Sequence, residues 1–129
     1  RAVEGLAAAG ARTTVDRIAA LRDDRALMVR VAVAVALAAL GDPRAEPLLQ
    51  ALATGAESRG LMQPHMALGL LAARRGMLSA ATAHLEHAVD TVPYNVDALR
   101  MLAQLYSRMG RSSDARARMA EAARFAPAP

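Results

Sequence analysis

Two prolines, Pro93 and Pro127, stand 34 residues apart, and the sequence repeats itself at that interval. A shift by one period lays LGLLAARRG at 68–76 over LAQLYSRMG at 102–110. The same shift pairs small and large apolar residues further along, namely Ala81 with Ala115, Leu85 with Met119 and Ala88 with Ala122. A fixed period of this length is typical of stacked helical hairpins, each too small to bury its apolar face alone. The repeat therefore predicts an all-α chain folded as an α-α superhelix, a right-handed solenoid.

The composition agrees with helices and limits the kinds of site. The apolar residues are mostly Ala, Leu, Val and Met, and the only aromatic residues are Tyr94, Tyr106 and Phe125. Small side chains suit closely packed helices and suit a β-sandwich poorly. The chain has no cysteine, so disulfides and thiolate metal sites are excluded.

The basic character of the chain is modest, with a net charge of +4 carried by arginine and no lysine. A nucleic-acid footprint is normally a concentrated basic stripe. One stretch approaches such a stripe but is interrupted by Asp114 and Glu121, and it consists of Arg108, Arg111, Arg116, Arg118 and Arg124. We therefore expect a solvated helix face there and no nucleic-acid partner.

The most apolar run, 26–40, contains Arg30 and is too short to span a bilayer, so it predicts a buried core helix. We expect a soluble protein without a membrane partner. The compartment stays open, with the cytoplasm as the preferred expectation. The oligomeric state is not indicated by the sequence.

Local start and stop signals predict eight antiparallel helices with short loops. A short helix over 2–9 would be closed by Gly10, and Thr13 would cap a second helix that ends near residue 22. The next helix would end at Gly41, where the turn GDPR places stop and start residues side by side. The six helices after the second are expected at about 25–40, 43–54, 62–75, 79–92, 96–109 and 112–125, with Ser79, Asn95 and Ser112 or Ser113 as N-caps.

The second half closely resembles the tetratricopeptide repeat, in two copies at 62–95 and 96–129. The residues that carry the resemblance in the first copy are His65, Leu68, Gly69, Ala72, Ala81, Leu85 and Pro93, and those in the second are Leu99, Leu102, Ala103, Tyr106, Ala115, Met119 and Pro127. His65 and Leu99 replace the usual tryptophan, and Ala72 replaces the usual aromatic residue. In this pattern Gly69 or Ala103 lets the partner helix approach closely.

The first half resembles the short HEAT-like repeats of phycobilin lyases, on the strength of VRVAVAVALAALGDPRAEPLLQAL at 29–52. The loop-like stretch TGAESRG at 54–60 would be the seam between the halves. We therefore expect HEAT-like hairpins over 1–60 and two tetratricopeptide repeats over 61–129, stacked as one continuous solenoid.

The resemblance implies a binding groove lined by the first helix of each hairpin. The groove-facing residues would be Gln63, Met66, Leu70 and Arg74 in the first copy and Asp97, Arg100, Gln104 and Arg108 in the second. The last three follow at helical steps of four and so share a face. Arginine binds carboxylates through two parallel hydrogen bonds, which favours an acidic peptide or a free C-terminus. The plainer alternative is a solvated face on which Asp97 pairs with Arg100.

The sequence gives little support for a metal site or for a catalytic site. His84, His87 and Asp90 follow at steps of three and could begin a metal site, but exposed polar residues are the preferred interpretation, and His65 is expected to fill a packing position. No phosphate loop, nucleophile elbow or zinc-protease motif occurs. We expect a non-enzymatic protein–protein interaction module or scaffold that uses no cofactor and binds a protein or peptide. The alternatives are a structural repeat segment of a larger, catalytic protein and a nucleic-acid accessory protein that uses the C-terminal arginines.

Overall fold

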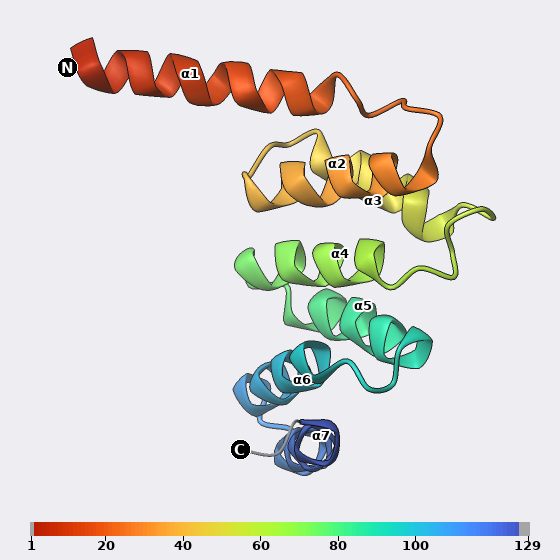
Figure 1. The fold of residues 1–129 in the computed structure, drawn as a ribbon. Helices are drawn as coiled ribbons and strands as arrows, with labels where there is room; N and C mark the ends of the chain where they lie inside the picture. The colour runs from red at the N-terminus through yellow and green to blue at the C-terminus, as the bar shows by residue number, and fades with distance from the viewer. Residues whose placement is uncertain (1, 127–129) are drawn as a thin grey trace. The chain divides into compact units, whose positions relative to one another are not determined.

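The computed structural model describes residues 2–126, with side chains from residue 10 onward, and every regular element among them is an α-helix (Figure 1). These helices are α1 (Ala2–Ala19), α2 (Leu27–Ala39), α3 (Ala45–Thr54), α4 (Gln63–Arg74), α5 (Leu78–Thr91), α6 (Val96–Arg108) and α7 (Ser112–Phe125). Successive helices pack against each other from α1 to α3 and from α4 to α7, with the densest packing in the pairs α4–α5 and α6–α7. The predicted all-α repeat fold is confirmed.

The described residues hold seven helices rather than the predicted eight, because α1 is continuous through Gly10 and Thr13. The expected helix end at Gly10 and the expected N-cap at Thr13 are therefore wrong. Thr14 Oγ1 donates to the Gly10 carbonyl at 3.0 Å, a bond that a residue inside a helix makes to the preceding turn. A glycine inside a helix costs only about 1 kcal/mol, and the alanine-rich sequence around it favours the helix.

Three glycines end helices, each just after a helix end expected at about 40, 75 or 109. Gly41, Gly76 and Gly110 have φ values of +74°, +73° and +76°, the left-handed conformation that glycine adopts without strain. The residue after each glycine donates its N–H to a carbonyl five positions earlier, as Met77 does to Ala72 at 2.9 Å and Arg111 does to Tyr106 at 2.8 Å.

The N-caps agree with the sequence only in part. Asn95 Oδ1 accepts from the Ala98 N–H at 3.1 Å, which confirms the predicted cap of α6. The predicted caps Ser79, Ser112 and Ser113 are wrong, because each serine already lies in the first turn of α5 or α7. The residue directly after each glycine, Met77 or Arg111, occupies the N-cap position, so the serines that follow lie inside the helix.

The chain forms two compact units, residues 1–58 and 59–129. In the first unit, Leu37 and Leu49 are fully buried at the contact of α2 with α3. Arg44 bonds Asp42 at 2.8 Å and Asp16 at 3.1 Å, so the GDPR turn is tied to α1. Hydrogen bonds from the Arg44 side chain and backbone lower the pKa of Asp42 to about 2.

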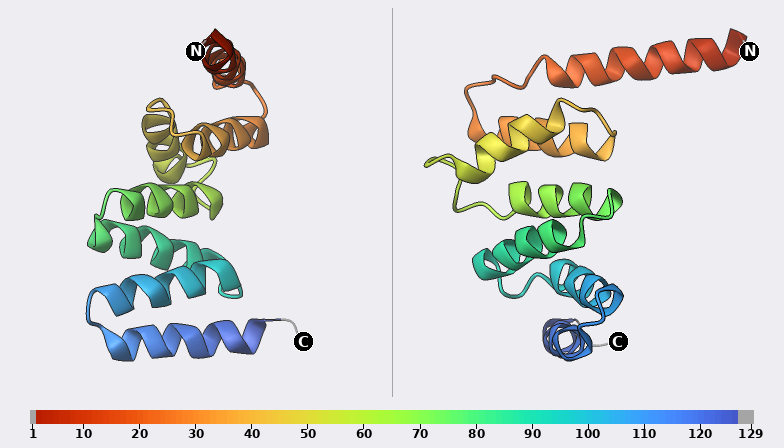
Figure 2. Two further views of the ribbon diagram at one scale, coloured as in Figure 1. Left: turned by 90° about the vertical axis from the view of Figure 1, so that its left-hand side faces the viewer. Right: turned by 180° about the vertical axis from the view of Figure 1, so that it is seen from behind.

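The second unit has one continuous core shared by α4, α5, α6 and α7, seen as successive layers in both views of Figure 2. Gly69 is the point of closest approach, since a Cβ built there would lie 2.9 Å from Leu85 Cγ. Both residues are buried, and Leu85 is fully so. The predicted role of Gly69 in close helix packing is confirmed.

Two glycine substitutions should have opposite effects. Gly110→Ala should destabilise the second unit by about 1–2 kcal/mol, because alanine is strained at φ +76°. Gly10→Ala should instead raise stability by up to about 1 kcal/mol, because Gly10 lies inside α1 and nothing lies within 4 Å of an added Cβ. Urea unfolding followed by far-ultraviolet circular dichroism measures both changes. Effects of the same sign would contradict this assignment of the two glycines.

Candidate functional site

A groove of about 230 Å³ lies between α4 and α6, the first helices of the two hairpins of the second unit. We call it the α4–α6 groove, and its lining residues are Leu70, Ala73, Met101, Gln104, Leu105 and Arg108. Leu70 and Ala73 come from the C-terminal half of α4, while the other four follow the facing stripe of α6. The groove thus combines an apolar lining with one amide and one guanidinium group.

Three of the eight groove residues predicted from the sequence lie together here: Leu70, Gln104 and Arg108. Asp97 and Arg100 are exposed one or two turns nearer the start of α6, outside the lining, and Arg74 is exposed at the last residue of α4.

The remaining two predicted residues, Gln63 and Met66, are only partly exposed in the first turn of α4. Met66 packs against the core of the second unit. The Asn95 amide donates to the sulfur of Met62 at 2.9 Å and approaches that of Met66 at 4.0 Å. This end of α4 is therefore partly covered by the start of α6, and a ligand would meet the other end first.

The two arginines of α6, Arg100 and Arg108, have no acidic partner among the described side chains. Within the described part of the chain, neither Arg100 nor Arg108 makes an ion pair, and Asp97 does not pair with Arg100. Both guanidinium groups belong to exposed residues. Because neither charge is neutralised by a side chain of residues 10–126, both are available to a carboxylate ligand.

Two of the C-terminal arginines form ion pairs within the second unit. Arg111 pairs with Asp114 at 2.8 Å and stacks 4.5 Å above the Tyr106 ring. Arg118 pairs with Glu121 at 2.8 Å and also with Glu86 of α5. Two of the five arginines considered for nucleic-acid binding are thus engaged within the protein.

Glu86 ties three helices together. It accepts a hydrogen bond from the Tyr106 hydroxyl at 2.6 Å and bonds the Arg118 guanidinium, so α5 is linked to both α6 and α7. Burial, and next the bond to Glu86, raise the pKa of Tyr106 to about 12. This arrangement is structural, because the hydroxyl and the carboxylate satisfy each other.

Three histidines gather between α4 and α5. The ring centroid of buried His65 lies 3.7 Å from that of His87 and 5.9 Å from that of His84. Neither ring nitrogen of His65 has a hydrogen-bond partner among the described residues. Burial, and next the nearby His87 and His84, lower the pKa of His65 to about 4.

The histidines do not form a recognisable metal centre. Among the described residues, no group of three or more His, Cys, Asp or Glu side chains is arranged to hold a metal ion. The steps of three in the sequence pointed to His84, His87 and Asp90, whereas the structure places His65 beside the two histidines. The sequence signal for this cluster was Gly69, because a glycine at that place lets α4, which carries His65, pack closely on α5, which carries His84 and His87.

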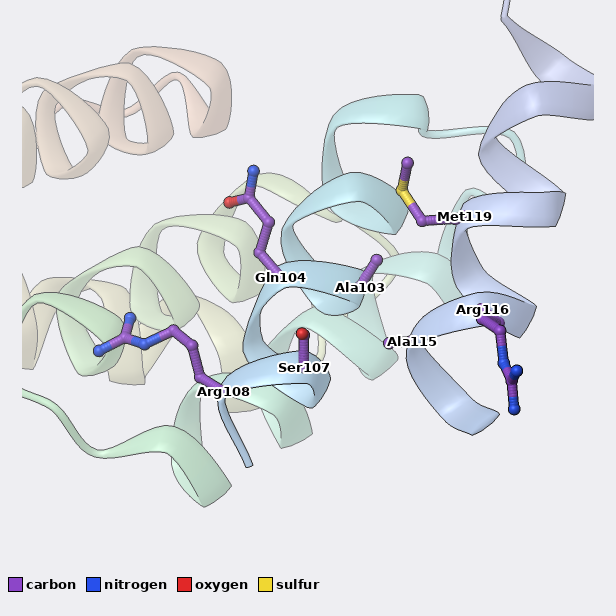
Figure 3. A pocket seen from close by; sticks show the side chains of 7 residues that line it. All are labelled: Ala103, Gln104, Ser107, Arg108, Ala115, Arg116 and Met119. Carbon is purple, nitrogen blue, oxygen red and sulfur yellow. The ribbon is translucent and has the colours of Figure 1, made fainter. Parts of the chain in front are cut away.

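A larger hollow of about 550 Å³ lies on α6 and α7 and was not predicted from the sequence (Figure 3). Its lining residues are Ala103, Gln104, Ser107, Arg108, Ala115, Arg116 and Met119. Figure 3 shows Arg108 and Arg116 extending on opposite sides, with Ser107 and Ala115 between them. The 34-residue repeat aligns Met119 with Leu85, but only the structure shows that Met119 is exposed whereas Leu85 is buried.

None of the helices within residues 2–126 combines the length and the apolar character that crossing a membrane requires. No curated protein and no solved structure matches the chain significantly. Residues 72–129 match the family model of the tetratricopeptide repeat. Repeats of this family generally mediate protein–protein interactions or serve as scaffolds, typically without catalysis. Residues 72–129 are therefore similar to the tetratricopeptide repeat.

Proposed function

We propose that this chain is a protein–protein interaction module whose α4–α6 groove binds an acidic peptide. The observation that carries the proposal is the combination of apolar Leu70 and Met101 with Gln104 and Arg108 in one groove of about 230 Å³. Binding grooves are mostly apolar and carry a few polar groups that orient the ligand. Because the cationic group at this groove has no acidic partner in the described residues, the ligand would supply the carboxylate.

The spacing of the two arginines suggests the form of the ligand. Arg100 and Arg108 are eight residues apart on α6, which corresponds to about 12 Å along a helix axis. An extended peptide covers about the same distance in four residues. A peptide with two carboxylates at that separation and an apolar residue between them could pair with both arginines while its apolar side chain enters the groove.

The test is the binding of labelled peptides to the full 129-residue chain, measured by fluorescence anisotropy. The probes are extended peptides with two glutamates that flank Leu, Met or Phe, made with amidated and with free C-termini. We expect Arg100→Glu combined with Arg108→Glu to weaken binding by about 100-fold, because both attractions become repulsions. Of the two single changes, Arg108→Glu should weaken binding more than Arg100→Glu, because only Arg108 lines the groove.

The matched control is Arg12→Glu combined with Arg17→Glu, the same change of charge on exposed residues of α1. This variant should bind the peptides as the unchanged chain does, and both double variants should keep their helical circular dichroism. Equal loss of binding in the two double variants would show attraction by net charge only. Undiminished binding by the α6 variant would overturn the proposed groove.

A further inference from the structure

The hollow on α6 and α7 marks an apolar surface that the described residues leave uncovered. We call it the α6–α7 end face and define it by Ala103, Ser107, Ala115, Arg116 and Met119. Met119 is 52% exposed. In the whole of α7 only Ala122 is buried, whereas α5, the corresponding helix of the first copy, has five buried residues.

The internal repeat indicates what kind of element fits this face. Ala81, Thr82 and Leu85 precede Ala115, Arg116 and Met119 by one period of 34 residues. Those three residues of α5 are 0%, 5% and 0% exposed.

In the first copy, helix α6 covers this position. α5 packs on α6, and Ala81 and Leu85 share one core with residues of α6 that include Leu99, Leu102 and Tyr106. In the first copy, the surface that corresponds to the end face is therefore covered by α6, an amphipathic helix with large apolar residues at steps of three and four.

We propose that the α6–α7 end face binds an amphipathic α-helix of a partner protein, seated as α6 is seated on α5, with a carboxylate opposite Arg116. Arg116 occupies the position of buried Thr82, so a helix seated in this way would cover a guanidinium group. Arg116 has no acidic partner in the described residues. A covered charge requires a counter-charge, and the occupant must supply it.

A second copy of the chain fits this face less well. Symmetric pairing of two end faces would bring the Arg108 and Arg116 side chains of both copies into one interface. Arg108 likewise makes no ion pair within the described residues. Like charges placed together in this way oppose association. An occupant that carries carboxylates avoids this cost, which favours a partner of opposite charge.

The test uses the 129-residue chain and a helical peptide derived from α6. The probe is a labelled, side-chain-stapled peptide of residues 96–108 carrying Arg100→Glu and Arg108→Glu, so that the apolar stripe is kept and its flanks are acidic. Fluorescence anisotropy should show saturable binding. Met119→Glu should weaken it by about 100-fold, because a charge would enter the apolar contact. Arg116→Glu should weaken it by about 10-fold.

Arg124→Glu is the matched control. It makes the same change of charge on α7, but its counterpart Asp90 is exposed in the first copy, so binding should be unchanged. Met119 and Arg116 do not line the α4–α6 groove, so these variants leave the proposed peptide groove intact. Peptide binding that is indifferent to Met119→Glu and Arg116→Glu would overturn the proposal.

Sedimentation analysis of the chain without peptide tests the other occupant. We expect a monomer whose state does not depend on Met119. A dimer that dissociates in the Met119→Glu variant would assign the face to a second copy and would overturn the proposed partner helix. A photoreactive residue introduced at position 119 should crosslink to the acidic peptide. Crosslinking to a segment of the same chain instead would also contradict the proposal.

Discussion

Leu85→Ala should lower the free energy of unfolding of the second unit by about 2–5 kcal/mol. Leu85 is fully buried at the centre of the core that α4, α5, α6 and α7 share. Its removal loses the transfer free energy of the side chain and leaves a cavity that rigid helices fill only in part. Tyrosine fluorescence during urea unfolding measures the change, because both tyrosines, Tyr94 and Tyr106, belong to the second unit.

A double-mutant cycle tests the specific contact of Leu85 with Gly69. Gly69→Ala should itself destabilise by about 1–3 kcal/mol, since the new Cβ would lie 2.9 Å from Leu85 Cγ and 3.4 Å from the Ala81 carbonyl oxygen. In the double variant the methyl group added at residue 69 can occupy part of the space that the Leu85 side chain leaves empty. The combined loss should therefore be smaller than the sum of the two single losses. Simple additivity would contradict the close approach of α4 to α5 at this point.

Met119→Ala is the matched control for Leu85→Ala. Met119 occupies the same place in the repeat but is half exposed. Its truncation should cost less than about 1 kcal/mol. A loss as large as that of Leu85→Ala would mean that Met119 is covered in the isolated chain, which would contradict the open end face.

Acidification should destabilise the second unit by up to about 3 kcal/mol through His65. Its pKa is lowered to about 4 in the folded chain, chiefly by burial and next by the nearby His87 and His84. In the unfolded chain it titrates near its ordinary value of 6.5. Between these values the unfolded state binds the proton and the folded state does not. Stability is therefore full above pH 6.5 and declines as the pH falls toward 4.

His65→Leu isolates this contribution. Leucine is the residue at the equivalent place of the second copy, where Leu99 is fully buried. The substitution removes two ring nitrogens that are buried without a hydrogen-bond partner in the described residues, so it should stabilise the unit at neutral pH. Urea unfolding at several pH values should show a flatter profile in the variant. The same steep decline in both proteins would exclude His65 as its cause.

The helical repeat fold was largely predictable because the sequence repeats its pattern of small and large apolar residues every 34 residues. The 34-residue shift aligns the glycines at 76 and 110, and both adopt the positive φ that their role as helix ends requires. Gly10 failed as a signal because an exposed glycine among alanines does not stop a helix. The serine caps failed because a tight glycine turn places the serines inside the next helix.

The candidate site was predictable only in part. Helical steps of four identified Gln104 and Arg108, which do line a groove. The same reasoning could not foresee that Asn95 covers Met66, because that contact depends on the turn between α5 and α6. The end face follows from comparing exposure between the copies, which a sequence does not contain. The HEAT-like character of 29–52 and the continuous stacking of the two units stay predictions.

The measurement that tests the proposed function most directly is a heteronuclear NMR titration of the full 129-residue chain with the tightest acidic peptide. If the α4–α6 groove is the binding surface, the largest shifts should fall on its two walls, at Leu70 and Ala73 of α4 and at Met101, Gln104 and Arg108 of α6. Shifts confined to α7 or α1, or no saturable shifts at all, would contradict the proposal that this groove captures acidic peptides.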